Sequence, residues 1–284
     1  MSFHSKLVVG TSSFRVKYSQ PVDISISVRG HVGEFTVEAF GLVLTGQPKT
    51  TEVCQAYGGI GVNCTSIEFN PHANGTHTEC VGHVAEQKRF YVEDCFPGII
   101  QGACLLISVE PLLVGEHKPE DIIYSALSTG DRVISGELVK EAIVKTLEAK
   151  GLAKEQCPSI LVIRTLPNDL KKYPTANNSV NWPYFTSDAI QVLDQFQIQH
   201  LLVDTPSLDR HPDGGKVESH KHFWQVSSDS VQSPRKNRSL TELCCIPDPL
   251  KDDIYFIILS LSSFAFLDAV PSRPILFPLE VDRN

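Results

Sequence analysis

The chain has 284 residues, of which 42% are hydrophobic and 20% charged, and its formal net charge is −8. This length and composition are typical of a globular protein with a sizeable core. The acidic balance argues against nucleic acid as a partner, because phosphate binding relies on clustered Lys and Arg. The one basic run, at residues 233–238, is short and lies among serines, so we interpret it as a solvated loop.

Targeting and redox signals are weak throughout the sequence. The N-terminus has no apolar segment of signal-peptide length. The longest apolar run, residues 254–267, is interrupted by serines and is too short to span a bilayer. The eight cysteines are scattered without a C-x-x-C pair, which favours free thiols in a reducing compartment. We therefore predict a cytoplasmic protein without a membrane partner.

The first half of the chain is predicted to be rich in strands. Residues 22–28 and 34–44 alternate apolar and polar side chains, as half-buried strands do. Residues 99–114 form a further β region that contains glycine. Residues 136–151 have the apolar spacing of an amphipathic helix, and Gly151 stands at its C-terminal end.

The second half alternates strands and helices. Residues 159–165 form a continuous apolar run, which is typical of a strand buried on both faces. A helix is predicted at 186–196, a buried strand at 199–209 and a core strand near 254–261. This alternation indicates a partly parallel sheet, and we predict one α/β domain over residues 1–284. The stretch 227–239 is predicted to be an exposed surface loop.

The segment "FNPHANGTHTECVGHV", residues 69–84, contains three histidines and a glutamate within twelve positions: His72, His77, Glu79 and His83. Asn74 and Gly75 form a turn pair between them, because glycine readily adopts positive φ. Imidazole nitrogens and carboxylate oxygens together suit zinc or manganese better than magnesium or calcium. On the residues alone, a metal site and a histidine-rich surface loop remain equal alternatives.

A second window, residues 204–224, contains three more histidines, and Glu242 follows it. Here the pieces resemble a known family. "GTHTECVGH" is similar to the H-x-G-T-H-x-D-x-P-x-H signature of the "Putative cyclase" family, which includes bacterial kynurenine formamidase and isatin hydrolase. "PVDISISV", "ILVIRT", "LLVDTPSLD" and the closing "DAVPSRPILFPL" at 268–279 match further pieces in the same order.

The resemblance implies a swivelling β/β/α fold, a mixed sheet with flanking helices, and a homodimer or larger assembly. It also implies one or two Zn²⁺ or Mn²⁺ ions. The residues that match ligands are His77, Glu79, His220 and Glu242, while His83 matches the residue that transfers protons.

Three positions depart from the signature. Ala73 stands where the first signature histidine belongs, and His72 is one place early, so His72 is the candidate for that ligand position. Glu79 replaces aspartate and moves the carboxylate one methylene outward, and Val81 replaces proline.

The function that follows is hydrolysis of a C–N bond in a small amide or cyclic amide by metal-activated water, with His83 moving the proton. Two alternatives remain open: a metal-dependent cyclase or lyase on the same site, and a non-catalytic binding protein that kept the fold.

Several other residues could have a catalytic or binding role, but we favour a structural role for each of them. Cys80 could pair with His83 as a nucleophile, but nothing in the sequence brings them together. Asp204 is expected to orient a turn after its strand, and Arg273 to form an internal salt bridge instead of binding a substrate carboxylate. Phe223 and Trp224 are expected to fill the core.

Overall fold

The computed structural model describes residues 5–28, 49–52, 65–85, 89–116, 124, 127–169, 181–227, 230–231 and 233–282. The predicted strand at 34–44 lies outside the described residues.

Ten strands form the main sheet, in the order β1-β2-β17-β16-β7-β10-β12-β15-β6, with β3 also paired to β17. Their bounds are β1 Lys6–Val9, β2 Ser12–Val16, β3 Val22–Asp23, β6 His77–Glu79, β7 Ile99–Val109, β10 Ile160–Thr165, β12 His200–Val203, β15 Ser239–Glu242, β16 Asp253–Leu261 and β17 Ala269–Val281. Because β6 pairs with both β15 and β17, the strands from β17 round to β6 close into a barrel-like ring.

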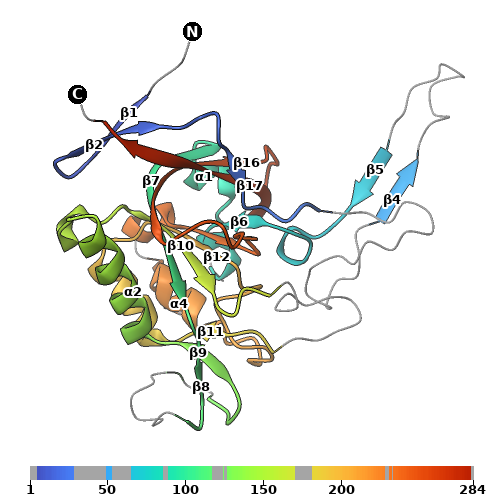
Figure 1. The fold of residues 1–284 in the computed structure, drawn as a ribbon. Coiled ribbons are helices and arrows are strands. Elements are labelled where there is room, and N and C mark those ends of the chain that lie inside the picture. The colour runs from blue at the N-terminus through green and yellow to red at the C-terminus, as the bar shows by residue number, and fades with distance from the viewer. Residues whose placement is uncertain are drawn as a thin grey trace, which may run out of the picture.

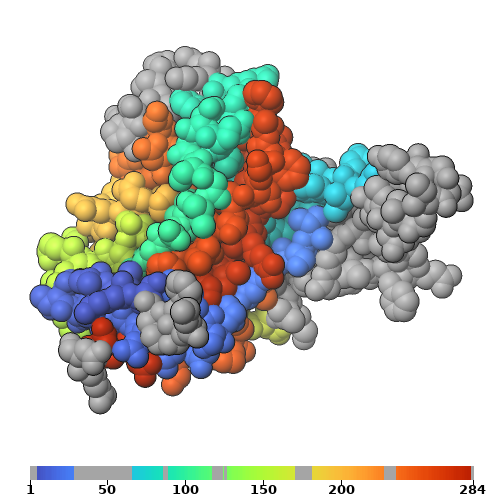
Figure 2. Space-filling model, turned by 90° about the horizontal axis from the view of Figure 1, so that it is seen from above, coloured from blue at the N-terminus to red at the C-terminus, as the bar shows by residue number. Residues whose placement is uncertain are grey.

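The centre of this sheet is parallel and its flank is antiparallel. β10 pairs in parallel with β7 and β12, and every residue of β10 is buried. The continuous apolar run predicted this, because a parallel strand is covered on both faces. β16 pairs antiparallel with both β7 and β17. Figure 2 shows β7 in teal beside the orange-red strands β16 and β17 at the surface. The mixed α/β class is confirmed.

Four α-helices are described: α1 Val92–Cys95, α2 Gly136–Ala149, α3 Ser187–Gln195 and α4 Glu218–Trp224. Short 3-10 segments are η1 Pro71–Ala73, η2 Val81–His83, η4 Lys154–Gln156 and η6 Ser233–Asn237. Among these described helices, none is long and apolar enough to cross a membrane. Figure 1 shows α2 beside the sheet and both chain ends on one side of the molecule.

Three small sheets accompany the main one. They are β8 Leu112–Leu113 with β9 Arg132–Ile134 and β11 Tyr184–Phe185, then β13 Val226–Ser227 with β14 Ser230–Val231, and β4 Lys49–Glu52 with β5 Thr65–Glu68. The β4–β5 ribbon projects from the body, and its second strand leads directly into the histidine-rich segment (Figure 1).

Helix α2 shows how local sequence determines an element. The Ser135 hydroxyl caps its N-terminus by accepting a hydrogen bond from the Leu138 amide, and Gly151 follows its C-terminus at φ +66°. Val139, Ile143 and Leu147 form its buried stripe. That stripe belongs to the larger apolar core, which also contains the central parallel strands and α3. The predicted helix at 136–151 is thus confirmed.

Two predicted strands are shorter in the structure. The segment 22–28 pairs only at Val22–Asp23 and through one bridge from Ser25 to Cys244. The segment 199–209 stops at Val203, because Asp204 turns away to bind the end of β10. The Asp204 carboxylate accepts hydrogen bonds from the amide and the hydroxyl of Thr165 at 2.7 and 2.9 Å, as expected of a residue that orients the turn.

In the stretch 227–239, predicted to be an exposed loop, Lys236 and Asn237 are exposed, whereas Arg238 and Ser239 are buried. Residues 233–237 form η6, and Arg238 is only 5% exposed. Arg235 and Arg238 both bind the carboxylate of Asp194 on α3, at 2.6 and 2.7 Å. The basic run therefore docks on α3 instead of remaining in solvent, because a carboxylate distant in sequence pairs with it.

His200 makes the stability of the fold depend on pH. Burial lowers its pKa to about 4, against an ordinary value near 6.5. The unfolded chain binds a proton that the native fold excludes, so stability is lost as the pH falls from 6.5 towards 4, by up to about 3 kcal/mol. We expect urea unfolding of H200Q to lack this part of the pH dependence. H222Q, which alters an exposed histidine, should behave like the unmodified protein, and an unchanged slope in H200Q would contradict this assignment.

Candidate metal centre

Strand β6 carries two of the predicted residues and fixes their position by its register. His77 lies opposite Glu242 of β15, and Glu79 lies opposite Leu240. The His77 Nε2 atom is 3.5 Å from a carboxylate oxygen of Glu242. The Nδ1 atom of the same ring lies 3.1 Å from the Gly75 carbonyl oxygen. Since a carbonyl can only accept, Nδ1 carries a proton, and Nε2 is the ring nitrogen that faces Glu242.

The turn before β6 requires its glycine. Gly75 has φ +97°, and a Cβ atom there would lie 2.7 Å from the Ile26 carbonyl oxygen. The next residue, Thr76, accepts a hydrogen bond from the Ile26 amide and donates one to the Leu243 carbonyl. The turn is therefore bound on two sides, and this sets the register that presents His77.

His220 approaches the same point from the first turn of α4. Its Nδ1 atom lies 2.5 Å from the Asp209 carboxylate, which also accepts hydrogen bonds from the backbone amides of Ser219 and His220. Its Nε2 atom lies 3.0 Å from Glu79 and 3.4 Å from Glu242. Asp209 thus fixes both the start of the helix and the orientation of the ring, as carboxylates do behind metal-binding histidines.

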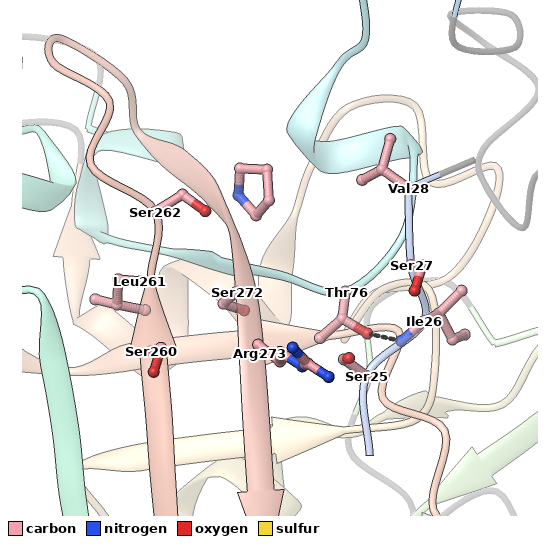
Figure 3. A pocket seen from close by; sticks show the side chains of 11 residues that line it. Ser25, Ile26, Ser27, Val28, Thr76, Ser260, Leu261, Ser262, Ser272 and Arg273 are labelled. Carbon is pink, nitrogen blue, oxygen red and sulfur yellow. Dashed lines mark hydrogen bonds between the residues drawn. The ribbon is translucent and has the colours of Figure 1, made fainter. Parts of the chain in front are cut away.

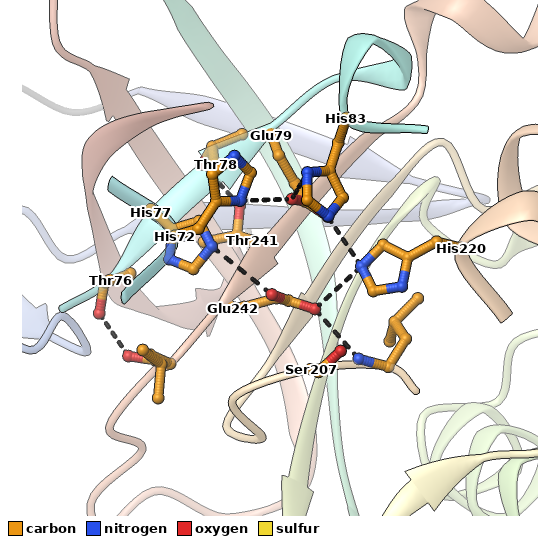
Figure 4. Close-up of polar contacts among 12 residues, drawn as sticks. His72, Thr76, His77, Thr78, Glu79, His83, Ser207, His220, Thr241 and Glu242 are labelled. Atoms are coloured by element: carbon orange, nitrogen blue, oxygen red, sulfur yellow. Dashed lines mark hydrogen bonds and ion pairs between the residues drawn. The ribbon is translucent and has the colours of Figure 1, made fainter. Parts of the chain in front are cut away.

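His72 and His83 complete the cluster on its more exposed side. Their rings stack with centroids 4.3 Å apart. The Nδ1 atom of His72 is 3.1 Å from Glu79, and that of His83 is 3.9 Å from it. Both rings also contact Asp268 of the loop before β17. Figure 4 shows the four imidazoles gathered around Glu79 and Glu242.

The electrostatics of the cluster are those of buried, opposed charges. Burial by itself would raise the pKa of Glu79, but the neighbouring imidazoles, first among them His83 and His220, hold it well below its usual range. Burial would lower the pKa of His72, yet the hydrogen bond to Asp268 and the neighbouring carboxylate of Glu79 raise it to about 10. The pKa of His220 is likewise raised, by Glu79 and Asp209, against the effect of burial.

Whether a cation fits the cluster can be judged from the hydrogen bonding of four atoms at its centre. Among the described residues, His77 Nε2, His220 Nε2 and both carboxylate oxygens of Glu79 are buried without a hydrogen-bond partner. They approach one another as closely as hydrogen-bonded atoms, but the angles of a hydrogen bond are missing. Buried polar atoms are rarely left in this state. These converging nitrogen and oxygen atoms, which lack hydrogen bonds to one another, form a candidate site for a cation, and a donor set of imidazoles and a carboxylate suits zinc or manganese.

The described residues contain three overlapping groups whose ligand atoms lie within 4.8 Å of one another: His72 with His77 and Glu79, Glu79 with His83 and His220, and His72 with His83 and Asp268. Glu79 belongs to two of these groups and is fully buried. The structure therefore contains a candidate His/Glu metal site. Five of the six residues named from the sequence belong to these groups, and the sixth, Glu242, lies 3.5 Å from His77 and 3.4 Å from His220. Their individual roles as ligands or proton carriers remain proposals.

Asp209 and Asp268 are not among the six site residues predicted from the sequence. Asp209 lies in "DTPSLD", and Asp268 begins the closing family segment. Asp209 follows a buried strand of a parallel sheet, where site residues often lie, so this position carried a usable signal. Asp268 had no such signal, because its contacts with His72 and His83 depend on the β17–β6 pairing.

The other singled-out residues have the structural contacts that we expected. The Cys80 thiol is buried, bonds to the Phe90 carbonyl and the Gly82 amide, and has its pKa raised by a hydrogen bond with Cys95 and by burial. That environment is the opposite of an activated nucleophile. All six described cysteines are free. Phe223 and Trp224 are fully buried in the core.

Arg273 lies apart from the metal centre. It borders a pocket of about 400 Å³ lined largely by serines, and Figure 3 shows its guanidinium between Ser25 and Ser272. Its Nε atom donates to the Asp23 carboxylate at 2.7 Å. This confirms the internal salt bridge, and the pair joins β3 to β17.

Comparisons with known proteins identify the fold and the family of the chain. A search of curated proteins found no match. Among solved structures, a potential metal-dependent hydrolase with cyclase activity is 15% identical, with 91% of this chain and 97% of that chain covered, at a TM-score of 0.53. A predicted metal-dependent hydrolase from Bacillus stearothermophilus is 17% identical, with 91% of this chain and 98% of that chain covered, at a TM-score of 0.52. Isatin hydrolase A from Labrenzia aggregata, bound to benzyl benzoate, is 13% identical, with 92% of this chain and 94% of that chain covered, at a TM-score of 0.56.

These identities are too low to transfer an activity, but they show the fold. The family model described as "Putative cyclase" matches residues 22–210, which is more than half of the chain and includes His72, His77, Glu79 and His83. The chain belongs to the "Putative cyclase" family.

Proposed function

We propose that the protein is a metal-dependent hydrolase that cleaves the C–N bond of a small amide or cyclic amide. One observation carries this proposal: the four buried ligand-type atoms of His77, Glu79 and His220 converge without hydrogen bonds. The similarity in fold to isatin hydrolase and to metal-dependent hydrolases supports it. The cyclase activity named for one structural neighbour supports a lyase as the alternative reaction.

Bound in this centre, a divalent cation supplies a Lewis acid for the carbonyl oxygen and acidifies water at neutral pH. His77, His220 and Glu79 would hold it at the buried end, with Glu242 beside them. Glu242 is fixed by a hydrogen bond from the Leu208 amide at 3.0 Å. Zinc and manganese both suit this set of nitrogen and oxygen donors.

His83 is the residue that we propose moves the proton. Its side chain is 29% exposed, whereas those of His77 and His220 are nearly inaccessible. Its Nδ1 atom lies 3.9 Å from Glu79, beyond hydrogen-bond distance, so the ring borders the centre without a fixed bond to it. A partly exposed imidazole beside the reacting bond can take a proton from water and give it to the leaving nitrogen.

The exchange of His83 for alanine tests this assignment. We expect kcat for amide hydrolysis to fall by about 10²–10⁴-fold, which is the usual contribution of a general acid–base residue, while the metal content stays equal to that of the unmodified protein. The assay uses manganese- or zinc-loaded protein with N-formylkynurenine and a panel of lactams. H222A, which alters an exposed histidine on α4, is the control. Loss of metal in H83A would show that His83 is a ligand instead.

The same assay separates the rival functions. Ring opening of a lactam or loss of formate from a formamide supports the hydrolase. Elimination or cyclisation products without water addition would support the lyase. Metal-free protein that binds the small amides unchanged would support the non-catalytic binding protein.

A further inference from the structure

Asp268 contacts two imidazoles of the metal centre at once. One of its carboxylate oxygens lies 3.0 Å from His72 Nε2 and 3.3 Å from His83 Nδ1. His72 uses its other ring nitrogen, Nδ1, to face Glu79 at 3.1 Å. A metal-bound imidazole keeps one N–H and gives one lone pair to the cation, so a proton kept on Nε2 by Asp268 would leave Nδ1, which faces Glu79, as the atom that binds a cation.

The backbone of Asp268 is anchored on both sides, so its carboxylate has a defined position. Its carbonyl oxygen accepts a hydrogen bond from the Cys80 amide at 2.9 Å. The preceding residue, Leu267, accepts one from the Val92 amide at 2.9 Å, and the following residue, Ala269, pairs with Glu79 in the β17–β6 ladder. Asp268 and the residue after it are thus fixed to the end of β6, which presents the ligands, and the residue before it is fixed to α1.

A role for Asp268 as a ligand itself is less well supported by its contacts. Its Oδ2 atom forms hydrogen bonds with two ring nitrogens. The oxygens of Glu79 also lie 3.0 and 3.1 Å from ring nitrogens, but they are buried and form no hydrogen bond with them. Its side chain is also 40% exposed, in contrast to the fully buried Glu79. These differences place Asp268 behind the imidazoles, where carboxylates orient ligands.

We propose that Asp268 is a positioning residue that turns His72 into an Nδ1 ligand of the metal centre. This would compensate for Ala73 at the neighbouring position, which carries no donor atom. The inference rests on the proposed metal-dependent function, but it concerns only how the cation is held.

A double-mutant cycle on metal affinity tests the proposal without an activity assay. The affinity for Zn²⁺ is measured by chelator competition for the unmodified protein, H72A, D268A and H72A/D268A. The Co²⁺ absorption spectrum of each loaded protein gives a second readout, because it reports the geometry of the ligands. D23A, which removes a carboxylate from the Asp23–Arg273 pair outside the centre, is the matched control.

If Asp268 acts through His72, D268A weakens zinc binding by about 10–100-fold and changes the Co²⁺ spectrum. The same exchange made in the H72A background changes the affinity by less than about threefold, because the residue through which it acts is gone. D268N, which keeps one acceptor oxygen for His72, should recover part of the affinity. D23A should leave affinity and spectrum unchanged.

Two results would overturn the proposal. Equal losses from D268A in both backgrounds would show that Asp268 does not act through His72, and an unchanged affinity in D268A would show that it does not act at all. If D268A folds poorly, the zinc affinity of D268N alone tests the proposal, because the amide preserves the shape of the side chain. Absence of zinc binding by the unmodified protein would instead reject the proposed function, so the two failures are distinguishable.

Discussion

Replacing His220 by alanine is expected to remove stoichiometric metal and to lower kcat/KM by about 10³-fold or more. His220 Nε2 lies within 3.4 Å of both Glu79 and Glu242, so its loss takes away the nitrogen that faces both carboxylates. A cation that polarises a carbonyl and acidifies water contributes several kcal/mol to the transition state, and this contribution disappears with the ion. Metal analysis of protein purified without chelator and an assay on the best amide measure the two effects.

The helix that carries His220 also provides the control. His222 lies two residues further along α4 and is exposed, whereas His220 is 2% exposed. H222A should keep both metal and activity, while it changes the same residue type on the same helix. Full metal occupancy in H220A, or an equal loss in H222A, would show that the α4 imidazole is not a ligand.

Glu79→Gln is expected to have the second large effect. The carboxylate is fully buried and contacts His72, His83 and His220, so it is the common neighbour of the imidazoles. The amide preserves the size of the side chain but removes the negative charge that would oppose a divalent cation. We expect the zinc affinity to fall by at least about 10²-fold, more than for a residue that only supports a ligand. Chelator competition measures this change.

Two further variants make the Glu79 result specific. E79D keeps the charge but withdraws the carboxylate by one methylene, so its affinity should lie between those of E79Q and the unmodified protein. E280Q removes an exposed carboxylate from the end of β17, where it pairs with Lys17, and should have no effect. If E79Q and E280Q bind zinc equally well, the Glu79 carboxylate is not part of the centre.

The elements most visible in the sequence were those whose stability is local or whose burial is complete. Helix α2 has its own cap, its own apolar stripe and its terminal glycine, so residues 136–151 predict it without tertiary information. β10 appears in the sequence as a run of apolar residues because its side chains are buried in apolar clusters on both faces of the sheet. By contrast, the docking of residues 233–238 on α3 depended on Asp194, which no local pattern connects to them.

The candidate site was visible for a similar reason. His72, His77, Glu79 and His83 are close in sequence, so a turn suffices to gather them. His220 and Glu242 could be associated with them only through the family resemblance, because the pairing of β6 with β15 and the docking of α4 are long-range contacts. The supporting residues Asp209 and Asp268 required the structure, since a carboxylate behind a ligand leaves no spacing pattern of its own.

Metal content tests the central claim most directly, namely that His77, Glu79 and His220 share one cation. The protein is purified without chelator, and bound zinc and manganese are measured for the unmodified chain and for H77A. We predict about one equivalent or more of divalent metal in the unmodified protein and nearly none in H77A. Equal metal content in the two proteins, or no metal in either, would contradict the claim.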